Sequence, residues 1–457
     1  MTVAPQIFRE YDIRGLVGSE LDADTARDVG RAFAVYLDEV DVHGPIAVGR
    51  DNRPSGDALR DALVASLTES GVDVVDVGVV PTPTLYWALE RLGVAGGVQI
   101  TASHNPAPYN GFKLCVGTSA LYGDDIQKLL VIVERGNRVT PSKPGSVREE
   151  AILDRYLDDI VSRIGPLERP LSIALDCANG VGSLVGPRLM DRLGVRVTQC
   201  LLCTSDGRFP KRQPDPSQAQ NLADLQQAVR ATSAQVGIAL DGDADRIGVV
   251  DEHGEIVWGD RVLAIYARDV LARDPGKPVI FDVKCSEALP QAITAAGGKP
   301  FMWRTGHSLI EAKMHELHAP LAGELSGHMY IADGYYGFDD ALYAAARLLS
   351  IMASSGKSVT ELLAGVPVYP STPEIRVDCP DDKKFEIVRQ AVAHWRASHT
   401  VVDVDGARVI FDGGWGLIRA SNTQPALVCR FEAHTPDQLK AIQSEMEAWL
   451  RQQGVSI

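Results

Sequence analysis

Short apolar runs alternate with longer amphipathic stretches over most of the chain. In the N-terminal third, runs suited to buried strands are followed by stretches in which apolar residues recur at helical spacing. Parallel strands covered by helices produce this alternation, so the pattern predicts an α/β unit. Its predicted strands span residues 46–48, 72–77 and 98–100, and its predicted helices span residues 57–69 and 84–92.

Two further α/β units are predicted after a linker at residues 138–145, which contains proline, serine and basic residues. Two strands of the second unit end in Ile-Ala-Leu-Asp, at Asp176 and Asp241. The carboxyl ends of strands face the ligand crevice in open α/β sheets. The predicted elements are strands 171–175 and 236–240 with a helix over 180–193 in the second unit, and strands 279–283 and 300–303 in the third.

The C-terminal segment has a different pattern. A strand over 374–377 and a helix over 381–399 are followed by two strands around a turn near Asp412. The closing helix starts at Thr435 and stops at Gly454. The predicted fold is therefore three consecutive α/β mixed-sheet domains and a C-terminal α+β domain, with boundaries at residues 1–150, 151–255, 256–367 and 368–457.

The composition is that of a soluble globular protein. Hydrophobic residues make up 45% of the 457 positions, and neither a long apolar window nor a signal-peptide pattern is present. A cytoplasmic protein without a membrane partner is expected. The net charge of −15 and the lack of a basic stripe argue against nucleic acid. No coiled-coil pattern is evident, so a monomer is the default. The seven cysteines, Cys200 and Cys203 included, are expected to be reduced thiols.

A serine in a predicted turn is the first candidate for chemistry. Ser103 stands in Thr-Ala-Ser-His-Asn-Pro, directly after an apolar strand. The Asn105-Pro106 pair favours a tight turn that exposes the hydroxyl to a reactant or ligand. The motif differs from the Gly-x-Ser-x-Gly pattern of hydrolases. A turn serine without any function remains an open interpretation of this segment alone.

Three aspartates at alternate positions form the second candidate. Asp241, Asp243 and Asp245 can converge on one hard cation, and Mg²⁺ prefers such oxygen ligands. A calcium-binding EF-hand also begins in this way and would use Glu252. However, Arg246 occupies the position that needs glycine, and the flanks are predicted strands. Arg246 could bind a phosphoryl oxygen, which favours a metal site over a solvated acidic turn.

Two later loops carry side chains suited to a sugar and to a phosphate. The segment Gly-Glu-Leu-Ser-Gly-His at 323–328 places Glu324 where it could accept hydrogen bonds from two adjacent hydroxyls. The segment Arg-Ala-Ser-Asn-Thr-Gln-Pro at 419–425 offers a guanidinium, two hydroxyls and an amide, which could cradle a phosphate dianion. Either segment by itself could be an ordinary polar turn.

The order and spacing of these four segments resemble one family over the full chain. The sequence resembles the α-D-phosphohexomutases, specifically the bacterial phosphomannomutase/phosphoglucomutases, from Phe-Arg-Glu-Tyr-Asp-Ile-Arg-Gly at 8–15 to residues 419–430. The resemblance implies four domains around a central cleft. It also implies that hexose 1-phosphate and hexose 6-phosphate, of mannose or glucose, are interconverted through a phosphoserine and a 1,6-bisphosphate intermediate.

The resemblance also implies roles for individual residues. Ser103 would carry the phosphoryl group, with His104, Lys113 and Arg246 beside it. Ser103, Asp241, Asp243 and Asp245 would hold Mg²⁺, and glucose 1,6-bisphosphate would be the activator. His104 and Lys113 are alternative bases for the attacking hydroxyl. The residues expected to contact the phosphosugar substrate are Tyr11, Arg14, Lys284, His307, Glu324, Ser326, His328, Arg419, Ser421, Asn422 and Thr423.

Two positions depart from the family pattern. Ala244 stands where many members have glycine. Leu325 replaces the methionine common in phosphomannomutase/phosphoglucomutases or the glutamine common in phosphoglucosamine mutases, and its apolar side chain favours the former group.

Other functions compatible with these residues are a phosphatase, a phosphosugar sensor and a phosphoglucosamine mutase. The intact serine, aspartates and loops argue against the sensor. Closure of the last domain is expected about residues 367–373, which contain three prolines, because a bisphosphate that reorients must be retained.

Overall fold

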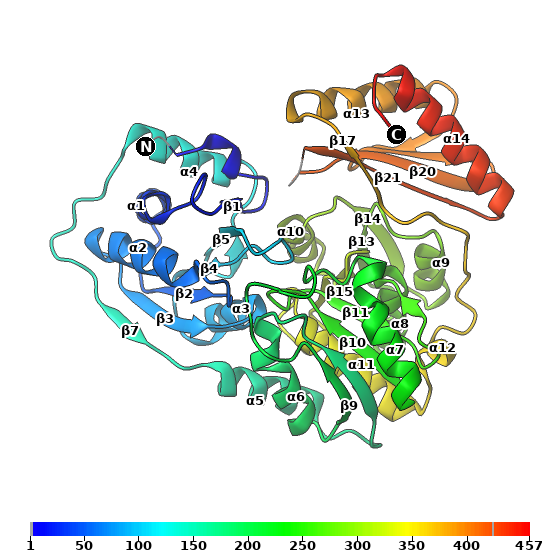
Figure 1. Ribbon diagram of the computed structural model, residues 1–457, viewed down its shortest axis with the longest axis horizontal. Helices are drawn as coiled ribbons and strands as arrows, with labels where there is room; N and C mark the ends of the chain where they lie inside the picture. The colour runs from blue at the N-terminus through cyan, green and yellow to red at the C-terminus, as the bar shows by residue number, and fades with distance from the viewer. Residues whose placement is uncertain (1–2, 423–424) are drawn as a thin grey trace.

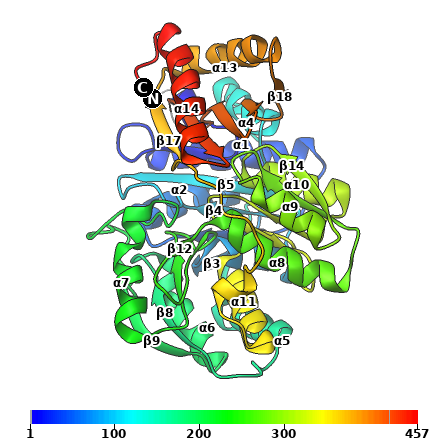
Figure 2. The same ribbon diagram turned by 90° about the vertical axis from the view of Figure 1, so that its right-hand side faces the viewer.

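The strands of the protein form four separate sheets, as a computed structural model describing residues 3–422 and 425–457 shows. The sheets follow one another along the chain, each with its own helices (Figure 1). The last sheet and its two helices, orange to red, lie at one end of the molecule (Figures 1 and 2). This arrangement confirms the predicted fold class of three α/β domains and one α+β domain.

The first sheet is mixed, with strand order β1-β5-β4-β2-β3-β7 and β6 paired to β5. Its centre is parallel, because β2 pairs with both β3 and β4 in that sense, whereas β5 runs antiparallel to its neighbours. Its strands are β1 (Ile13–Leu16), β2 (Ile46–Arg50), β3 (Val74–Val79), β4 (Gly96–Ile100), β5 (Tyr109–Val116), β6 (Ser119–Ala120) and β7 (Val147–Glu149). The helices are α1 (Ala23–Glu39), α2 (Gly56–Glu69), α3 (Thr82–Arg91) and α4 (Asp124–Arg135).

The second and third sheets have strand orders β12-β11-β10-β8-β9 and β14-β13-β15-β16. The second contains β8 (Ser172–Asp176), β9 (Arg196–Leu201), β10 (Val236–Leu240), β11 (Ile247–Val250) and β12 (Ile256–Val257), with helices α5 (Leu153–Ile164), α6 (Gly186–Arg192) and α7 (Ala223–Thr232). The third contains β13 (Pro278–Asp282), β14 (Lys299–Trp303), β15 (Leu321–Gly323) and β16 (Met329–Ile331), with helices α8 (Gly259–Arg273), α9 (Ala288–Ala295), α10 (His307–Leu317), α11 (Ala341–Ser355) and α12 (Val359–Leu362).

The fourth sheet is antiparallel, with strand order β17-β21-β20-β19-β18. It consists of β17 (Ile375–Asp378), β18 (Thr400–Val402), β19 (Ala407–Phe411), β20 (Gly414–Ala420) and β21 (Ala426–Ala433), and helices α13 (Asp381–Arg396) and α14 (Pro436–Gln452) accompany it. Its core is separate and includes Trp395, Phe431 and Met446. By contrast, one core that includes Trp87, Leu175 and Leu348 extends through the first three domains. The fourth domain therefore has a core of its own, and a small apolar cluster of Val283, Trp415 and Leu417 joins it to the third domain.

Three local predictions differ from the structure. The helix expected over 180–193 is divided into a 3-10 turn, Val181–Leu184, and α6, where Pro187 lies in the first turn. Proline has no backbone N–H and suits the start of a helix, so a new helix begins there. The helix expected to reach residue 399 ends at Arg396.

The third difference concerns the cysteines. Cys200 and Cys203 form a disulfide, so the prediction that both are reduced thiols is wrong. The chain reverses just after β9 through Leu202, whose φ is +49°, and this brings the two Cα atoms to 5.9 Å, within reach of a bridge. Sequence spacing alone does not reveal this reversal. Cys115, Cys177, Cys285, Cys379 and Cys429 are free and buried.

Within the described ranges, no helix has the length and apolar character that a membrane span needs.

Candidate active site

Ser103 lies in a tight turn just after β4, at the carboxyl edge of the first sheet. Its φ of +49° is left-handed, and its side chain is buried. The Ser103 hydroxyl donates to Asp241 Oδ2 over 3.0 Å and lies 3.1 Å from His104 Nδ1. The turn is therefore the sharp one that Asn105-Pro106 predicts, and it aims the hydroxyl at the aspartate loop of the second domain.

The turn is clamped by an arginine that the sequence analysis did not identify. Arg53 donates through Nη2 to the carbonyl oxygens of Ser103 (2.8 Å) and Asn105 (2.7 Å). Its Nε donates to Asp51 Oδ2 over 3.0 Å, and Thr101 Oγ1 donates to the same oxygen. The left-handed serine is thus held by carbonyl contacts to a buried guanidinium.

The three predicted metal ligands converge between β10 and β11. The carboxylates of Asp241, Asp243 and Asp245 lie within 4.8 Å of one another and are fully buried. Burial, together with the charges of Asp245 and Asp243, raises the pKa of Asp241 well above its usual value. Oδ1 of Asp243 and Oδ1 of Asp245 are buried without a hydrogen-bond partner. Orphaned carboxylate oxygens in a crowded acidic pocket suit a hard divalent cation, so these residues fit a metal ion.

Lys113, on β5, balances part of this negative charge. Its Nζ lies 3.2 Å from Asp243 Oδ2 and 2.5 Å from Asp245 Oδ2. Burial lowers the pKa of the ammonium group, but the two carboxylates outweigh burial and raise the pKa above its ordinary value. Lys113 is therefore a fixed positive charge at the site.

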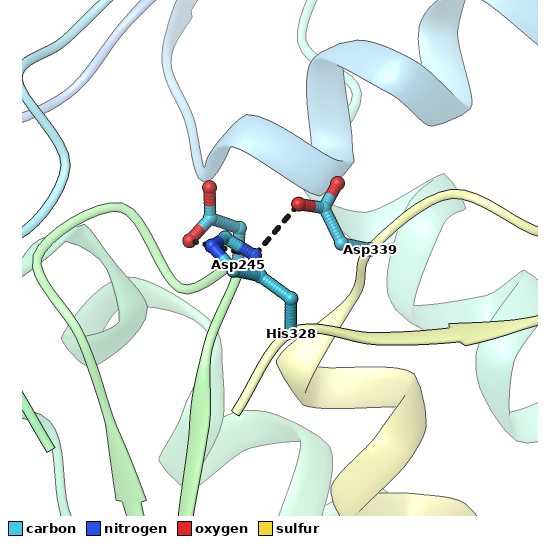
Figure 3. Close-up of side chains that lie close together, drawn as sticks. All are labelled: Asp245, His328 and Asp339. Carbon is cyan, nitrogen blue, oxygen red and sulfur yellow. Dashed lines mark ion pairs between the residues drawn. The ribbon is translucent and has the colours of Figure 1, made fainter. Parts of the chain in front are cut away.

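Arg246 is oriented by His328, which in turn contacts Asp339. Arg246 Nε donates to His328 Nε2 over 2.9 Å, so this nitrogen has no proton. The imidazole proton then lies on Nδ1, which is 2.8 Å from Asp339 Oδ2 and 3.7 Å from Asp245 Oδ1 (Figure 3). Burial opposes it, but these carboxylates raise the pKa of His328. Because Nδ1 carries a proton, it cannot coordinate a cation, and the cluster of Asp245, His328 and Asp339 is an array of ion pairs rather than a second metal site.

The predicted sugar loop follows β15 of the third domain. Glu324 is buried, and Tyr330 donates to its Oε1 over 3.0 Å. Gly327 has a φ of +98°, and a Cβ there would lie 2.3 Å from the carbonyl oxygen of Ile247. The glycine thus permits the loop to approach the second domain. Ser326 Oγ is buried without a hydrogen-bond partner and borders the cavity described below, so it is available to a polar ligand.

Lys284 joins the end of β13 in the third domain to the C-terminal domain. Its Nζ donates to Glu374 Oε2 over 3.2 Å and lies 3.6 Å from Asp282 Oδ2. Burial would raise the pKa of Glu374, but Lys284, Arg376 and other cations lower it to about 2. This ion pair lies at the start of the C-terminal domain.

The predicted phosphate loop begins at the end of β20. Arg419 Nε donates to Asp405 Oδ2 over 3.0 Å, and Arg419 Nη2 forms an ion pair with the same oxygen at 3.0 Å. Asn422 donates to the hydroxyl of Tyr11, which in turn donates to the carbonyl oxygen of Thr305 over 2.7 Å. Thr423 lies outside the described residues. The first, third and fourth domains therefore meet at Tyr11.

One cavity of about 380 Å³ is bordered by all four domains. The predicted residues among its lining are Tyr11, Arg14, His104, Arg246, Lys284, His307, Glu324, Ser326, His328, Arg419, Ser421 and Asn422. Ser103 and Asp241 lie behind the cavity lining, because Ser103 Oγ contacts His104 Nδ1 and Asp241 Oδ1 accepts from the backbone N–H of Arg246. Asp243 and Asp245 cluster with Asp241, and Lys113 pairs with both of them. The structure therefore brings every described candidate residue to one place.

Four further residues support the site and were missed. Asp51 and Arg53 follow the predicted strand 46–48. The carboxyl ends of strands face the ligand crevice, and this rule, which was applied to Asp241, could have revealed them as well. Asp339 and Asp405 had no local signal, because their partners His328 and Arg419 are recognised only in three dimensions.

Comparison with known proteins shows which family the chain matches. Models of the phosphoglucomutase/phosphomannomutase α/β/α domains I, II and III match residues 5–138, 154–254 and 258–369, and the model of the C-terminal domain matches residues 374–448. A Pseudomonas putida phosphomannomutase/phosphoglucomutase is 45% identical over 438 residues, covering 95% of this chain and 93% of the relative. A Neisseria gonorrhoeae phosphoglucomutase is 44% identical over 450 residues, covering 98% and 97%.

A solved structure agrees with these relatives. A phosphoglucomutase/phosphomannomutase family protein from Burkholderia thailandensis superposes with a TM-score of 0.90 at 41% identity, covering 98% of each chain. The fold and the site therefore define an enzyme of the intramolecular phosphotransferase class, a mutase. The chain belongs to the phosphoglucomutase/phosphomannomutase family, which confirms the family resemblance found in the sequence.

Proposed function

We propose that this mutase interconverts the 1- and 6-phosphates of mannose and glucose, with Ser103 as the phosphoryl carrier. The observation that carries the proposal is the shared cavity, which is bordered by His104 and Arg246 beside the serine and by Arg419 and Asn422 of the C-terminal domain. A phosphosugar has two ends to hold, and the cavity offers cationic groups from different domains. The names of the relatives, phosphomannomutase/phosphoglucomutase and phosphoglucomutase, agree with this substrate class.

In the proposed reaction, the free sugar hydroxyl attacks the phosphorus of phosphorylated Ser103. The bond from phosphorus to Ser103 Oγ breaks, and the product is a 1,6-bisphosphate. After the bisphosphate reorients, Ser103 Oγ attacks its other phosphoryl group and the sugar monophosphate leaves. Asp241, Asp243, Asp245 and the serine oxygen would hold Mg²⁺, which supplies charge neutralisation at the phosphoryl group. Arg246, held by His328, would bind the equatorial oxygens.

His104 is the better placed of the two bases that the sequence left open. Its Nδ1 lies 3.1 Å from Ser103 Oγ, and it borders the cavity. Burial and the neighbouring Arg246 and Arg14 lower its pKa well below the ordinary histidine value, so the imidazole is neutral and can accept a proton. Lys113 is held as a cation by two aspartates and contributes charge instead.

The sugar and the second phosphate are assigned to separate loops. Glu324 and Ser326 are proposed to bind the 3- and 4-hydroxyls, which glucose and mannose share. Arg419, Ser421 and Asn422, with Thr423 as predicted from the sequence, are proposed to bind the phosphate that is not transferred. Tyr11, Arg14, Lys284 and His307 complete the proposed substrate contacts.

Several broader assignments belong to the same proposal. Glucose 1,6-bisphosphate is the proposed activator, because it phosphorylates a serine that has lost its phosphoryl group. The proposed domain boundaries are residues 1–150, 151–255, 256–367 and 368–457. A cytoplasmic monomer without nucleic-acid or membrane partners completes the proposal.

The test is turnover of mannose 1-phosphate and glucose 1-phosphate, primed with glucose 1,6-bisphosphate. Both are expected to yield the 6-phosphate, and Ser103→Ala is expected to lose at least about 100-fold in rate. Mass spectrometry of the phosphorylated enzyme should place one phosphoryl group on the Ser103 peptide. Reaction of glucosamine phosphate alone would refute the substrate assignment. Release of phosphate without isomerised sugar would identify a phosphatase.

A further inference from the structure

Three cysteines of the second domain lie together beside the support of the serine turn. Cys200 and Cys203 are bridged at the end of β9, and the Sγ of Cys177 lies 3.7 Å from that of Cys203. Cys200 is exposed, Cys203 is partly buried and Cys177 is fully buried. A disulfide sulfur has no proton, so the contact is one in which the Cys177 thiol donates. The mutase chemistry uses none of the three.

We propose that the Cys200–Cys203 disulfide is a redox modification site. A dithiol reductant opens it, and the disulfide form of such a reductant closes it again. Cys177 acts as the hydrogen-bond donor to Cys203 when that sulfur leaves. The exposed sulfur of Cys200 is the one an external thiolate can reach, whereas Cys203 is covered on the side of Cys177. An intramolecular disulfide in a reducing compartment is usually of this responsive kind.

The electron count of the proposed step is balanced. A thiolate of the reductant attacks Cys200 Sγ, the bond between Cys200 and Cys203 breaks, and its electron pair passes to Cys203. The second thiolate of the reductant then attacks the reductant's other sulfur, which is bonded to Cys200 in the mixed disulfide, and so releases Cys200. Two electrons reach the protein, the reductant becomes a disulfide, and its two protons end on Cys200 and Cys203. Burial raises the pKa of Cys177, so it stays protonated and able to donate throughout.

The disulfide is joined to the serine turn by the loop that follows it. Asn179, two residues after Cys177, donates to the carbonyl oxygen of Thr204 over 2.7 Å. Asn52 donates to the carbonyl oxygen of Asn179 and to Ser205 Oγ, each over 2.8 Å. Leu202 is in the left-handed region, which side chains other than glycine rarely adopt, and the bridge spans it. Opening the bridge frees Leu202 to relax and loosens the loop against Asn52.

The same loop touches the serine turn in two more places. Phe209 packs against the guanidinium of Arg53 at 5.0 Å, and Arg53 holds the carbonyl oxygen of Ser103. Gln213 donates to the carbonyl oxygen of His104 over 3.0 Å. The redox state of Cys200 and Cys203 therefore changes how firmly the turn at Ser103 is held. This second half of the inference rests on the proposed role of Ser103, whereas the redox site itself does not.

The redox site is tested by thiol mapping on the full chain. Air-oxidised protein is treated with iodoacetamide, before and after dithiothreitol, and the labelled peptides are identified by mass spectrometry. Cys200 and Cys203 should be labelled only after reduction. Cys177→Ala should slow the reduction about threefold or more, and Cys177→Ser, which keeps a donor, should restore much of the rate. Cys429→Ala removes an equally buried thiol from the C-terminal domain and should leave the rate unchanged. Free thiols at Cys200 and Cys203 in the oxidised protein would overturn the site.

The coupling to the serine turn is tested by hydrogen exchange. Peptides spanning residues 101–109 and 203–213 should exchange faster in the reduced protein, while peptides of the C-terminal sheet should not change. The Cys200→Ser/Cys203→Ser variant should behave as the reduced protein in both buffers. Equal exchange in the two redox states would overturn the coupling. Neither readout needs turnover, so failure of the proposed mutase reaction would be seen separately in the phosphosugar assay.

Discussion

Ser103 shows how the conformation of a single residue is fixed by its surroundings. A left-handed serine costs about 1–2 kcal/mol relative to ordinary backbone. Four carbonyl oxygens of the turn, those of Ser103, Asn105, Pro106 and Tyr109, accept from Arg53. A planar guanidinium can bridge them all at once, and a lysine ammonium cannot.

Arg53→Lys is therefore expected to reduce kcat about tenfold or more while the substrate KM changes little, because the serine turn is displaced and the sugar loops are not. Steady-state kinetics with glucose 1-phosphate checks this result. Arg50→Lys is the matched control, since Arg50 pairs with the exposed Asp57. A variant at Arg53 with the kcat of the parent protein would exclude the clamp.

The aspartate loop predicts an effect of metal at the residue scale. Like charges buried together destabilise the folded protein, so binding of a divalent cation should raise Tm. Chelation is expected to abolish turnover, and added Mg²⁺ to restore it. Differential scanning fluorimetry should show a rise in Tm with Mg²⁺ that Asp243→Asn diminishes. Full turnover after exhaustive chelation would refute the metal site.

Ala244 in this loop has a φ of +61°, which explains why many family members carry glycine there. The methyl group is fully buried in the large core and so replaces some of the stability that the backbone loses.

At the scale of elements, α10 links the first and third domains. Its first residue, His307, borders the cavity, and the helix also packs against β6 of the first domain. Glu311 lies one turn further on, partly buried, and burial followed by the charges of Asp339 and Glu90 raises its pKa to about 8. This carboxyl is therefore a source of pH-dependent stability.

The direction of this pH dependence is set by the pKa values of Glu311 in the folded and unfolded states. The folded pKa of Glu311 is about 8 and the ordinary pKa of a glutamate is 4.5, so the folded protein holds this proton more tightly than the unfolded chain. The contribution of Glu311 to stability is complete below the unfolded pKa and is lost as pH rises through about 8. Thermal melts should show Glu311→Gln gaining about 4 kcal/mol on the parent between pH 5 and pH 8.5. Glu316→Gln, at an exposed position of the same helix, should show no such gain, and parallel melting curves for both variants would contradict the assignment.

At the scale of the whole molecule, the C-terminal domain has its own core and contacts the rest through polar side chains and through one small apolar cluster, Val283, Trp415 and Leu417. Arg9 lies 3.3 Å from Asp381, and the hydroxyl of Tyr11 joins Thr305 to Asn422. The polar contacts can break and re-form without exposing either of the large cores. They suit the domain closure expected about residues 367–373.

Tyr11→Phe is expected to favour an open form, because it removes two hydrogen bonds worth about 1 kcal/mol each. Small-angle scattering should show a larger radius of gyration for the variant, and glucose 1,6-bisphosphate should reduce the difference. Tyr36→Phe, in the core of the first domain, is the control. Identical scattering of the parent protein with and without bisphosphate would exclude closure.

The sequence pattern reveals some elements of this fold and hides others. Hydrophobic periodicity located the central strands, because a buried parallel strand needs a continuous apolar run whatever surrounds it. It missed edge strands such as β9 and β12, where exposure weakens the pattern. It predicted one helix where Pro187 separates two helical segments. The number and spacing of the cysteines did not predict the bridge between Cys200 and Cys203.

The sequence by itself determined the fold class, the family and most of the candidate residues, because these depend on local motifs and their order. Only the tertiary structure decided that Arg53 clamps Ser103, that Asp339 fixes the proton of His328, and that Cys177 faces a disulfide. Each of these contacts joins residues distant in the chain. Their geometry is set by how the sheets pack, and no local pattern of polar and apolar residues encodes it.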